Sequence, residues 1–282
     1  MSDKASALAG EAPARAGADD ALHDAPVGTL GFTLKLWATR LAVAAGALGF
    51  WEWASGTIID PFWVSSPSQV FERLREWVAT GSIWFHLGIT LQETIAGFVC
   101  GSLVGMSLGF LLGRNEFLGR VLDPFILSIY SLPKVALAPL FILWFGIGMS
   151  AKIVLSAVIV FFLVFYNTYA GVRDADQDLI DVVRLMKGKR RHVLMIAVIP
   201  SAMVWVFTGL KIAVPYALIG AVVGEMMASN KGLGHLIEGS AGQFDTAGVF
   251  AALFVLMIIS TTLHELLNRL EPVVLRWKLV NR

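Results

Sequence analysis

The sequence predicts an all-α polytopic membrane protein with about six transmembrane helices. Of its 282 residues, 56% are hydrophobic and only 15% are charged, whereas soluble domains carry about 25% charged residues. Its mean hydropathy is +0.71. Apolar runs close to the ~20 residues that span hydrocarbon recur along the chain. The net charge of +1 gives no basic excess that would indicate a nucleic-acid partner.

Six apolar stretches are the predicted spans. They cover residues 36–59, 87–113, 121–147, 153–171, 194–223 and 247–267. Most lysines and arginines then fall in the chain ends and loops of one side. The basic residues assigned to the other side are Arg73, Arg75, Lys152 and Lys231. The positive-inside rule therefore predicts that both termini lie in the cytoplasm. We expect the chain to be a multi-pass protein of the bacterial inner membrane.

The N-terminal segment differs in composition from the rest of the chain. Residues 1–35 are rich in Ala, Gly, Asp and Pro and lack an apolar core followed by a cleavage site. They predict a disordered cytoplasmic tail before a membrane domain at 36–282. Cys100 has no partner for an intrachain disulfide, and the histidines lack metal-ligand spacing, so we expect no metal site.

Glycine recurs every fourth residue within the second predicted span. The series is Gly97, Gly101, Gly105, Gly109 and Gly113. At this spacing the glycines line one face of a helix and allow a second helix backbone to approach closely. We therefore expect this span to be central in the bundle, with its partner helix in the same subunit or in another one.

Two lysines lie inside predicted spans. Lys134 lies between Pro133 and Pro139 in the third span, and Lys211 lies in the fifth. Charged, irregular segments at membrane depth are tolerated only against protein or a watery cavity. These ammonium groups can attract an anionic substrate, pair with backbone carbonyls or point toward a helix end. By contrast, we expect Glu93, near the outer end of its span, to reach water.

The loop at 172–200 is the longest polar stretch between spans, and it predicts a short helix. Asp174 and Gln177 have the spacing of a capping box. An apolar stripe follows at i, i+3, i+4 and i+7, formed by Leu179, Val182, Val183 and Met186. A helix of about a dozen residues is marginal alone. We expect the stripe to dock on a partner or to lie on the lipid surface.

This loop resembles the EAA loop of binding-protein-dependent ABC importer permeases. Asp181, Val182 and Val183 fall on the Glu-Ala-Ala of that pattern, and Pro200 falls on its proline. Two positions depart from the pattern. Lys187 occupies the usual glycine position, with Gly188 one place later, and Ile199 replaces a leucine.

Further fragments, in the same order along the chain, resemble the nitrate/sulfonate/taurine/bicarbonate branch of these permeases. They are Ser66 to Val70, Asp123 with Pro124, Ser131 to Leu140, Leu143 to Gly148, Asn167, Gly171 to Arg173, Gly209 to Ala213, Gly224 to Met226 and Ala228 to Gly234. The likeness extends from about Pro61 onward. Glu225 matches an acidic position of that family. We expect it to shape the outer gate, to pair with Lys231 or to have a structural role.

The resemblance implies the permease subunit of an importer that moves a small anion, such as a sulfonate, taurine, nitrate or a related organic anion. It also implies cytoplasmic ATP-binding subunits, a second permease copy in a homodimer and a periplasmic substrate-binding protein. The implied ATPase-coupling residues are Leu179, Asp181, Val182, Val183, Arg184, Met186, Gly188 and Pro200, and Lys134 and Lys211 are the candidates for the substrate pathway.

The division of labour follows from what the sequence lacks. It contains no Gly-x-x-x-x-Gly-Lys-Ser/Thr phosphate loop, so ATP hydrolysis is expected from a separate chain. We expect neither catalytic residues nor a cofactor. The alternatives are an ion-gradient-driven secondary transporter or channel, for which no clear inverted repeat is visible, and a membrane-embedded enzyme, for which no nucleophile, base and metal cluster is visible.

Overall fold

The computed structural model describes residues 30–276, and its regular elements are all helices. This confirms the all-α prediction. The chain divides into two units that are described separately, the first ending at Thr57 and the second beginning at Ile58. Residues 1–29 of the predicted tail lie outside the described residues.

The first unit contains one long helix, α2 (Leu30–Ala54). It covers most of the first predicted span, 36–59, but it begins and ends earlier. Lys35, Arg40 and Glu52 lie within it and lower its hydropathy. Consequently α2 is not among the described helices that are both long and apolar enough to cross a membrane.

The second unit supplies four helices that meet both conditions. They are α4 (Ser82–Gly113), α7 (Met149–Arg173), a continuous helix over Arg190–Ala228, and α12 (Thr246–Val274). The third of these consists of α9 (Arg190–Val193), the π-helical segment η2 (Leu194–Val198) and α10 (Ile199–Ala228). The four helices correspond to the second, fourth, fifth and sixth predicted spans.

The third predicted span, 121–147, is broken. It consists of α5 (Glu116–Tyr130), the 3-10 helix η1 (Lys134–Leu137) and α6 (Ala138–Phe145), and the chain bends by 77° at the break. Pro133 causes the break because it has no N–H and disfavours helical backbone at the preceding residue. Counted as one span, this pair raises the number in the described residues to five, against about six predicted.

Three short helices complete the second unit: α3 (Pro67–Ala79), α8 (Gln177–Leu185) and α11 (Leu233–Gly242). The Ser66 hydroxyl caps α3, and Pro67 occupies its first turn, where a missing N–H costs nothing. Arg73 of α3 forms an ion pair of 3.1 Å with Asp245, the N-cap of α12. The α3 helix is thereby joined to the start of α12.

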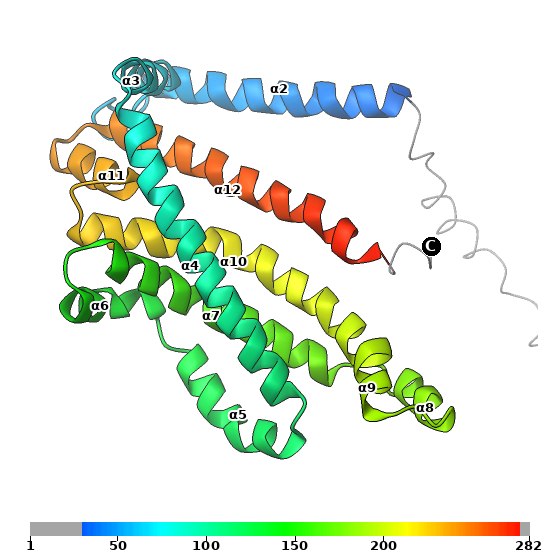
Figure 1. Ribbon diagram of the computed structural model, residues 1–282. Coiled ribbons are helices and arrows are strands. Elements are labelled where there is room, and N and C mark those ends of the chain that lie inside the picture. Colours follow the sequence, from blue (N-terminus) through cyan, green and yellow to red (C-terminus); the bar gives the residue numbers. More distant parts are fainter. Residues whose placement is uncertain (1–29, 277–282) are drawn as a thin grey trace, which may run out of the picture. The chain divides into compact units, whose positions relative to one another are not determined.

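The glycine series packs α4 directly against α7 of the same chain, as the crossing of these helices in Figure 1 illustrates. A β-carbon at Gly105 would lie 2.8 Å from the Phe161 carbonyl oxygen, and one at Gly109 would lie 2.7 Å from that of Phe165. Only glycine fits such a backbone contact. The predicted central position of this span is confirmed, and its partner helix lies within the same subunit.

Helix α10 also packs against α7. The buried Ser156 hydroxyl donates a hydrogen bond of 2.9 Å to the Ala217 carbonyl oxygen, and Gly220 of α10 lies against Ser156. Val160 and Val164 of α7 are fully buried in a core that includes Ala213 and Ala217. The three helices α4, α7 and α10 thus form the centre of the second unit.

Gly101→Ala should destabilise the fold by about 1–3 kcal/mol because its β-carbon would overlap the Ala157 carbonyl oxygen. We expect a lower melting temperature for the purified protein in detergent. Gly88→Ala is the matched control on the same helix, since its β-carbon would meet nothing within 4 Å. That change should leave the melting temperature unchanged or raise it, and equal losses in both variants would contradict this packing.

Single-cysteine labelling in a Cys100→Ser background tests the membrane orientation. We expect Gln243→Cys, at the exposed turn after α11, to react with an impermeant thiol reagent in intact cells. Lys189→Cys should react only after the membrane is opened, because its loop carries more lysines and arginines than any other loop between the spans. Protection of Ser2→Cys in intact cells would mean that α2 crosses the membrane. A reversed pattern at 189 and 243 would contradict the positive-inside assignment.

Candidate functional site

Helix α8 lies in the loop predicted at 172–200. The Asp176 carboxylate caps it by accepting hydrogen bonds from the N–H groups of Asp178 (2.9 Å) and Leu179 (3.2 Å). The predicted capping box of Asp174 and Gln177 is therefore wrong. Asp174 is the C-cap that follows α7, and the Gln177 side chain donates to the Ala175 carbonyl oxygen.

The C-terminus of α8 accounts for one of the two departures from the EAA pattern, Lys187 at the glycine position with Gly188 one place later. Lys187 has a φ of 57°, in the left-handed region that favours glycine. Its N–H donates to the Arg184 carbonyl, and the Gly188 N–H donates to the Val183 carbonyl, both at 2.9 Å. This is a Schellman motif with lysine at the usual glycine position. A β-carbon at Gly188 would lie 2.6 Å from the Val183 oxygen, so close packing requires that glycine.

The inner face of α8 differs from the predicted stripe. Ile180 and Val183 are buried, and Ile180 packs in a core with Val172 at the end of α7 and Val198 before α10. Val183 is only 7% exposed, so its place on an outward-facing stripe was a wrong prediction. Both sides of a short helix can be apolar when one side packs on its own chain.

The outer face of α8 exposes four apolar side chains, which we call the α8 surface. They are Leu179, Val182, Leu185 and Met186. Leu185 is 82% exposed, and the stripe predicted from the sequence did not include it. On the same helix Asp181 and Arg184 form an exposed ion pair of 3.2 Å. Pro200 lies in the first turn of α10, at the end of the loop.

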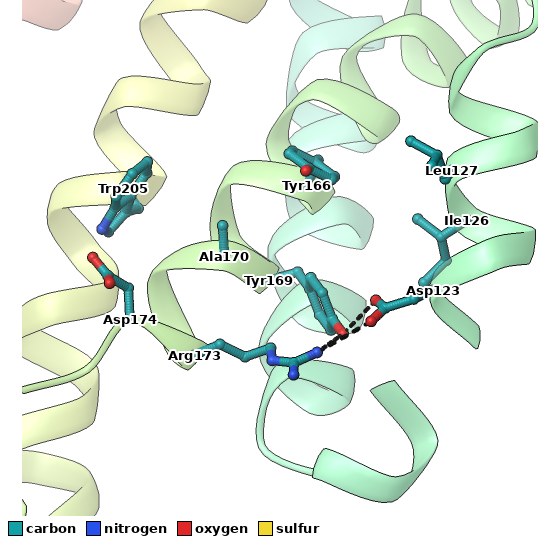
Figure 2. Close-up of a pocket in the computed structure, with 9 residues that line it drawn as sticks. All are labelled: Asp123, Ile126, Leu127, Tyr166, Tyr169, Ala170, Arg173, Asp174 and Trp205. Atoms are coloured by element: carbon teal, nitrogen blue, oxygen red, sulfur yellow. Dashed lines mark hydrogen bonds and ion pairs between the residues drawn. The ribbon is translucent and has the colours of Figure 1, made fainter. Parts of the chain in front are cut away.

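A groove of about 790 Å³ lies between α5, α7 and α10, near the end of α7 that leads to α8 (Figure 2). The Tyr169 hydroxyl donates a hydrogen bond of 2.6 Å to Asp123 of α5. Arg173 lies 3.4 Å from the other oxygen of Asp123 and also donates to the Tyr169 hydroxyl. These three side chains tie α5 to α7, and Trp205 of α10 lines the opposite side of the groove.

The two predicted pathway lysines lie in different surroundings. Lys211 of α10 forms an ion pair with Glu271 of α12, so a carboxylate of the same chain neutralises its charge. Lys134, at the bend between α5 and α6, donates a hydrogen bond of 2.6 Å to the Tyr130 carbonyl oxygen. The structure does not bring the two lysines into one cavity.

Glu93 and Lys152 form a buried ion pair that sequence reasoning missed. Glu93 of α4 lies 2.8 Å from the Lys152 ammonium of α7, and their side chains are 0% and 7% exposed. Glu93 does not reach water as expected, and Lys152 lies within the first turn of α7 rather than in a loop. The Lys152 ammonium also donates to the Ser229 hydroxyl, at 2.8 Å.

Glu225 holds the start of α11. Its carboxylate accepts hydrogen bonds of 2.7 Å from the Thr90 hydroxyl and from the Gly234 N–H. The Leu233 N–H in turn donates to the Thr90 hydroxyl, at 2.8 Å. Gly232 stands at the N-cap and has no side chain to offer, so residues of α4 and α10 satisfy the first N–H groups of α11.

No cluster of three or more His, Cys, Asp and Glu side chains that could hold a metal ion occurs among residues 30–276. The buried carboxylates of Glu93 and Glu225 are instead held by an ammonium, a hydroxyl and a backbone N–H. These polar groups join α4 to α7 and hold the start of α11.

Comparisons with a family model and with individual known proteins agree on one family of transport proteins. Residues 101–276 match the family described as binding-protein-dependent transport system inner membrane component. The formylaminopyrimidine transport permease protein ThiX of Halalkalibacterium halodurans is 32% identical, over 81% of this chain and 91% of the relative. The riboflavin transport system permease protein RibX of Chloroflexus aurantiacus is 33% identical, over 80% and 85%. The taurine transport system permease protein TauC of Escherichia coli is 29% identical, over 87% and 88%.

Solved structures show the same fold at lower identity. A chain of the inward-facing MetNI methionine ABC transporter gives a TM-score of 0.54 at 19% identity, covering 69% of this chain and 94% of that chain. A chain from the crystal structure of an amino acid ABC transporter with histidines gives a TM-score of 0.54 at 17% identity, covering 72% of this chain and 97% of that chain.

Lys187→Gly should stabilise α8 by about 1 kcal/mol, because glycine adopts the left-handed conformation without the steric cost of a β-carbon. We expect about fivefold slower hydrogen exchange at the α8 amides. Lys187→Ala removes the same charge but keeps the β-carbon, so it should give no such protection. Equal protection in both variants would assign the effect to the charge.

Proposed function

The chain belongs to the inner membrane component family of binding-protein-dependent transport systems, and from this premise we propose how it is coupled to ATP and what it carries. It is the permease subunit of an ATP-binding-cassette importer, a multi-pass membrane protein and a transport subunit rather than an enzyme. The proposal is that the α8 surface contacts a cytoplasmic ATPase and that the transported solute is a small anion.

The single observation that supports ATPase contact is the α8 surface. Leu185 and Met186 are 82% and 78% exposed on a helix outside the apolar spans. Apolar side chains at the centre of a patch with a charged rim are typical of protein interfaces. A helix that lies on anionic lipid has lysine and arginine on its polar face, whereas the exposed polar residues of α8 are Gln177, Asp178, Asp181 and a single basic residue, Arg184. These acidic residues favour a protein partner over the lipid surface.

The inner face of α8 supports a coupling role. Ile180 packs with residues at the end of α7 and before the start of α10, so α8 is fixed to two central helices. A movement of the ATPase groove would therefore move α7 and α10 together with α8. Val183 and Gly188 belong to this anchoring side, and Leu179, Val182, Arg184 and Met186 belong to the contact side, with Asp181 paired to Arg184.

The complete transporter would contain two ATP-binding subunits, a second copy of this permease and a periplasmic binding protein that delivers the solute. The distribution of lysine and arginine supports cytoplasmic positions for α8 and for both termini. In this orientation the groove beside Asp123 opens near the cytoplasmic end of α7, where a released solute would leave.

The solute is proposed to be a small anion of the sulfonate, taurine or nitrate type. The names of the relatives include taurine and aliphatic sulfonates as well as formylaminopyrimidine and riboflavin, so they do not converge on one substrate. Lys134 supplies a positive charge at membrane depth for the pathway. Lys211 pairs with Glu271, and we assign it to holding α10 against α12.

Val182→Glu should abolish ATPase retention without disturbing the fold. The side chain is half exposed, and glutamate is the better helix former. An unpaired carboxylate buried at the ATPase interface would cost about 3–5 kcal/mol, or a loss of affinity greater than a hundredfold. Co-purification of the ATPase with the tagged permease, together with membrane levels and uptake, measures this effect.

Gln177→Glu is the matched control, because it adds the same charge to the same helix at its exposed N-terminal end, where a carboxylate is favoured. It should retain the ATPase and transport. Val183→Glu is unsuitable as a test, since it would place a carboxylate inside the chain itself. Normal ATPase retention in Val182→Glu would contradict the proposed contact and favour the lipid surface.

A further inference from the structure

The three lysines within the spans differ in their partners. Lys152 pairs with Glu93, and Lys211 pairs with Glu271. Among the described residues Lys134 forms no ion pair with a carboxylate. A charge at membrane depth is costly unless it is paired, so the unpaired ammonium of Lys134 requires another explanation.

The bend after α5 explains how this ammonium is held in place. Tyr130 is the last residue of α5, and the break at Pro133 leaves its carbonyl without a helical N–H partner. The Lys134 ammonium donates to that oxygen at 2.6 Å. It also lies 4.6 Å and 5.1 Å from the ring centres of Tyr130 and Phe162, so two aromatic faces stabilise the cation.

The ammonium lines a cavity of about 270 Å³ between the bend, α7 and α10. The lining residues are Tyr130, Lys134, Val135, Ile159, Leu163, Tyr216 and Ile219. Lys134 is the only charged residue of the lining, and the others are aliphatic or tyrosine. The chemistry of the walls restricts what can bind.

We infer that this cavity binds a small organic anion with an apolar body, with Lys134 binding the acidic head and Tyr216 and Ile219 contacting the body. An ammonium has three donors, and the carbonyls of Tyr130 (2.6 Å) and Leu132 (3.5 Å) take two, which leaves one for a carboxylate or sulfonate. The inference rests on the proposed transport function and narrows the class of substrate within it.

The walls disfavour a bare inorganic oxyanion. Nitrate, bicarbonate and sulfate present acceptor oxygens over their whole surface, and acceptors that face aliphatic walls would lose hydrogen bonds to water without replacement. Ile159, Leu163 and Ile219 offer no donors, and besides Lys134 only the two tyrosine hydroxyls of the lining can donate. An organic acid, by contrast, places its oxygens at one end and its apolar surface against these side chains.

Ligand protection of a cysteine in the cavity tests the inference. The assay uses Ile219→Cys in a Cys100→Ser background, in the complete complex of permease and ATPase reconstituted in nanodiscs. The probes are benzenesulfonate, the neutral benzenesulfonamide of nearly the same shape, and inorganic sulfate. At about ten times its dissociation constant, benzenesulfonate should slow maleimide labelling about tenfold. The other two probes should change the rate little.

Two further variants show whether the charge of Lys134 is responsible. Lys134→Gln keeps a donor for the Tyr130 carbonyl but removes the charge, and it should lose the protection by benzenesulfonate. Lys134→Arg keeps the charge and should retain most of it. The melting temperature and the ATPase content of each complex are measured in parallel, so that a folding defect is recognised.

Three outcomes would overturn the inference: equal protection by benzenesulfonamide, equal protection by sulfate, or protection that survives in Lys134→Gln. Absence of protection in a complex that assembles and hydrolyses ATP would also overturn it, while the permease function would stand. Failure of the ATPase contact itself is detected separately by Val182→Glu, which does not involve the cavity.

Discussion

Along α4 and α7 the two backbones lie so close that a side chain at Gly105 would overlap the Phe161 carbonyl. In lipid, helices gain little from hiding apolar surface from one another, so close packing and interhelical hydrogen bonds must supply the association. The glycine series provides the first, and the Ser156 hydroxyl, bonded to the Ala217 carbonyl of α10, provides the second. The positions of α8, α11 and the cavity walls all depend on this three-helix centre.

The attachments at the two ends of this centre differ from those of α5. Toward one end the Glu93–Lys152 pair joins α4 to α7, and at the other end Ile180 anchors α8 to α7 and α10. Helix α5 is held to α7 by Asp123 with Tyr169 and by few other contacts. A motion passed through α8 would therefore act directly on α7 and α10, whereas α5 is joined to α7 through side chains such as Asp123 and Tyr169.

Periodicity and composition predicted the helical class, four of the spans and the central glycine helix, because these depend on local patterns. They did not predict the 77° bend, since the two prolines indicate a break but not its angle. They could not orient Val183, because a short helix with two apolar sides has two possible partners. The Glu93–Lys152 pair was missed because 59 positions separate its members, and only folding brings them together. The left-handed backbone of Lys187 has no signal in the sequence except Gly188, which lies one place after the usual glycine position.

At the turn before α11, the Glu225 side chain lies against two glycines, Gly232 and Gly234. The Glu225 carboxylate fills the space that a β-carbon at Gly232 would take, and it also lies against the place of one at Gly234. A side chain at Gly232 would overlap the Glu225 carboxylate, and one at Gly234 would overlap both the Val222 carbonyl oxygen and Glu225. A residue without an acceptor at position 225 would leave the Gly234 N–H unsatisfied. The start of α11 is therefore specified by three positions at once, two that must lack a side chain and one that must supply an acceptor.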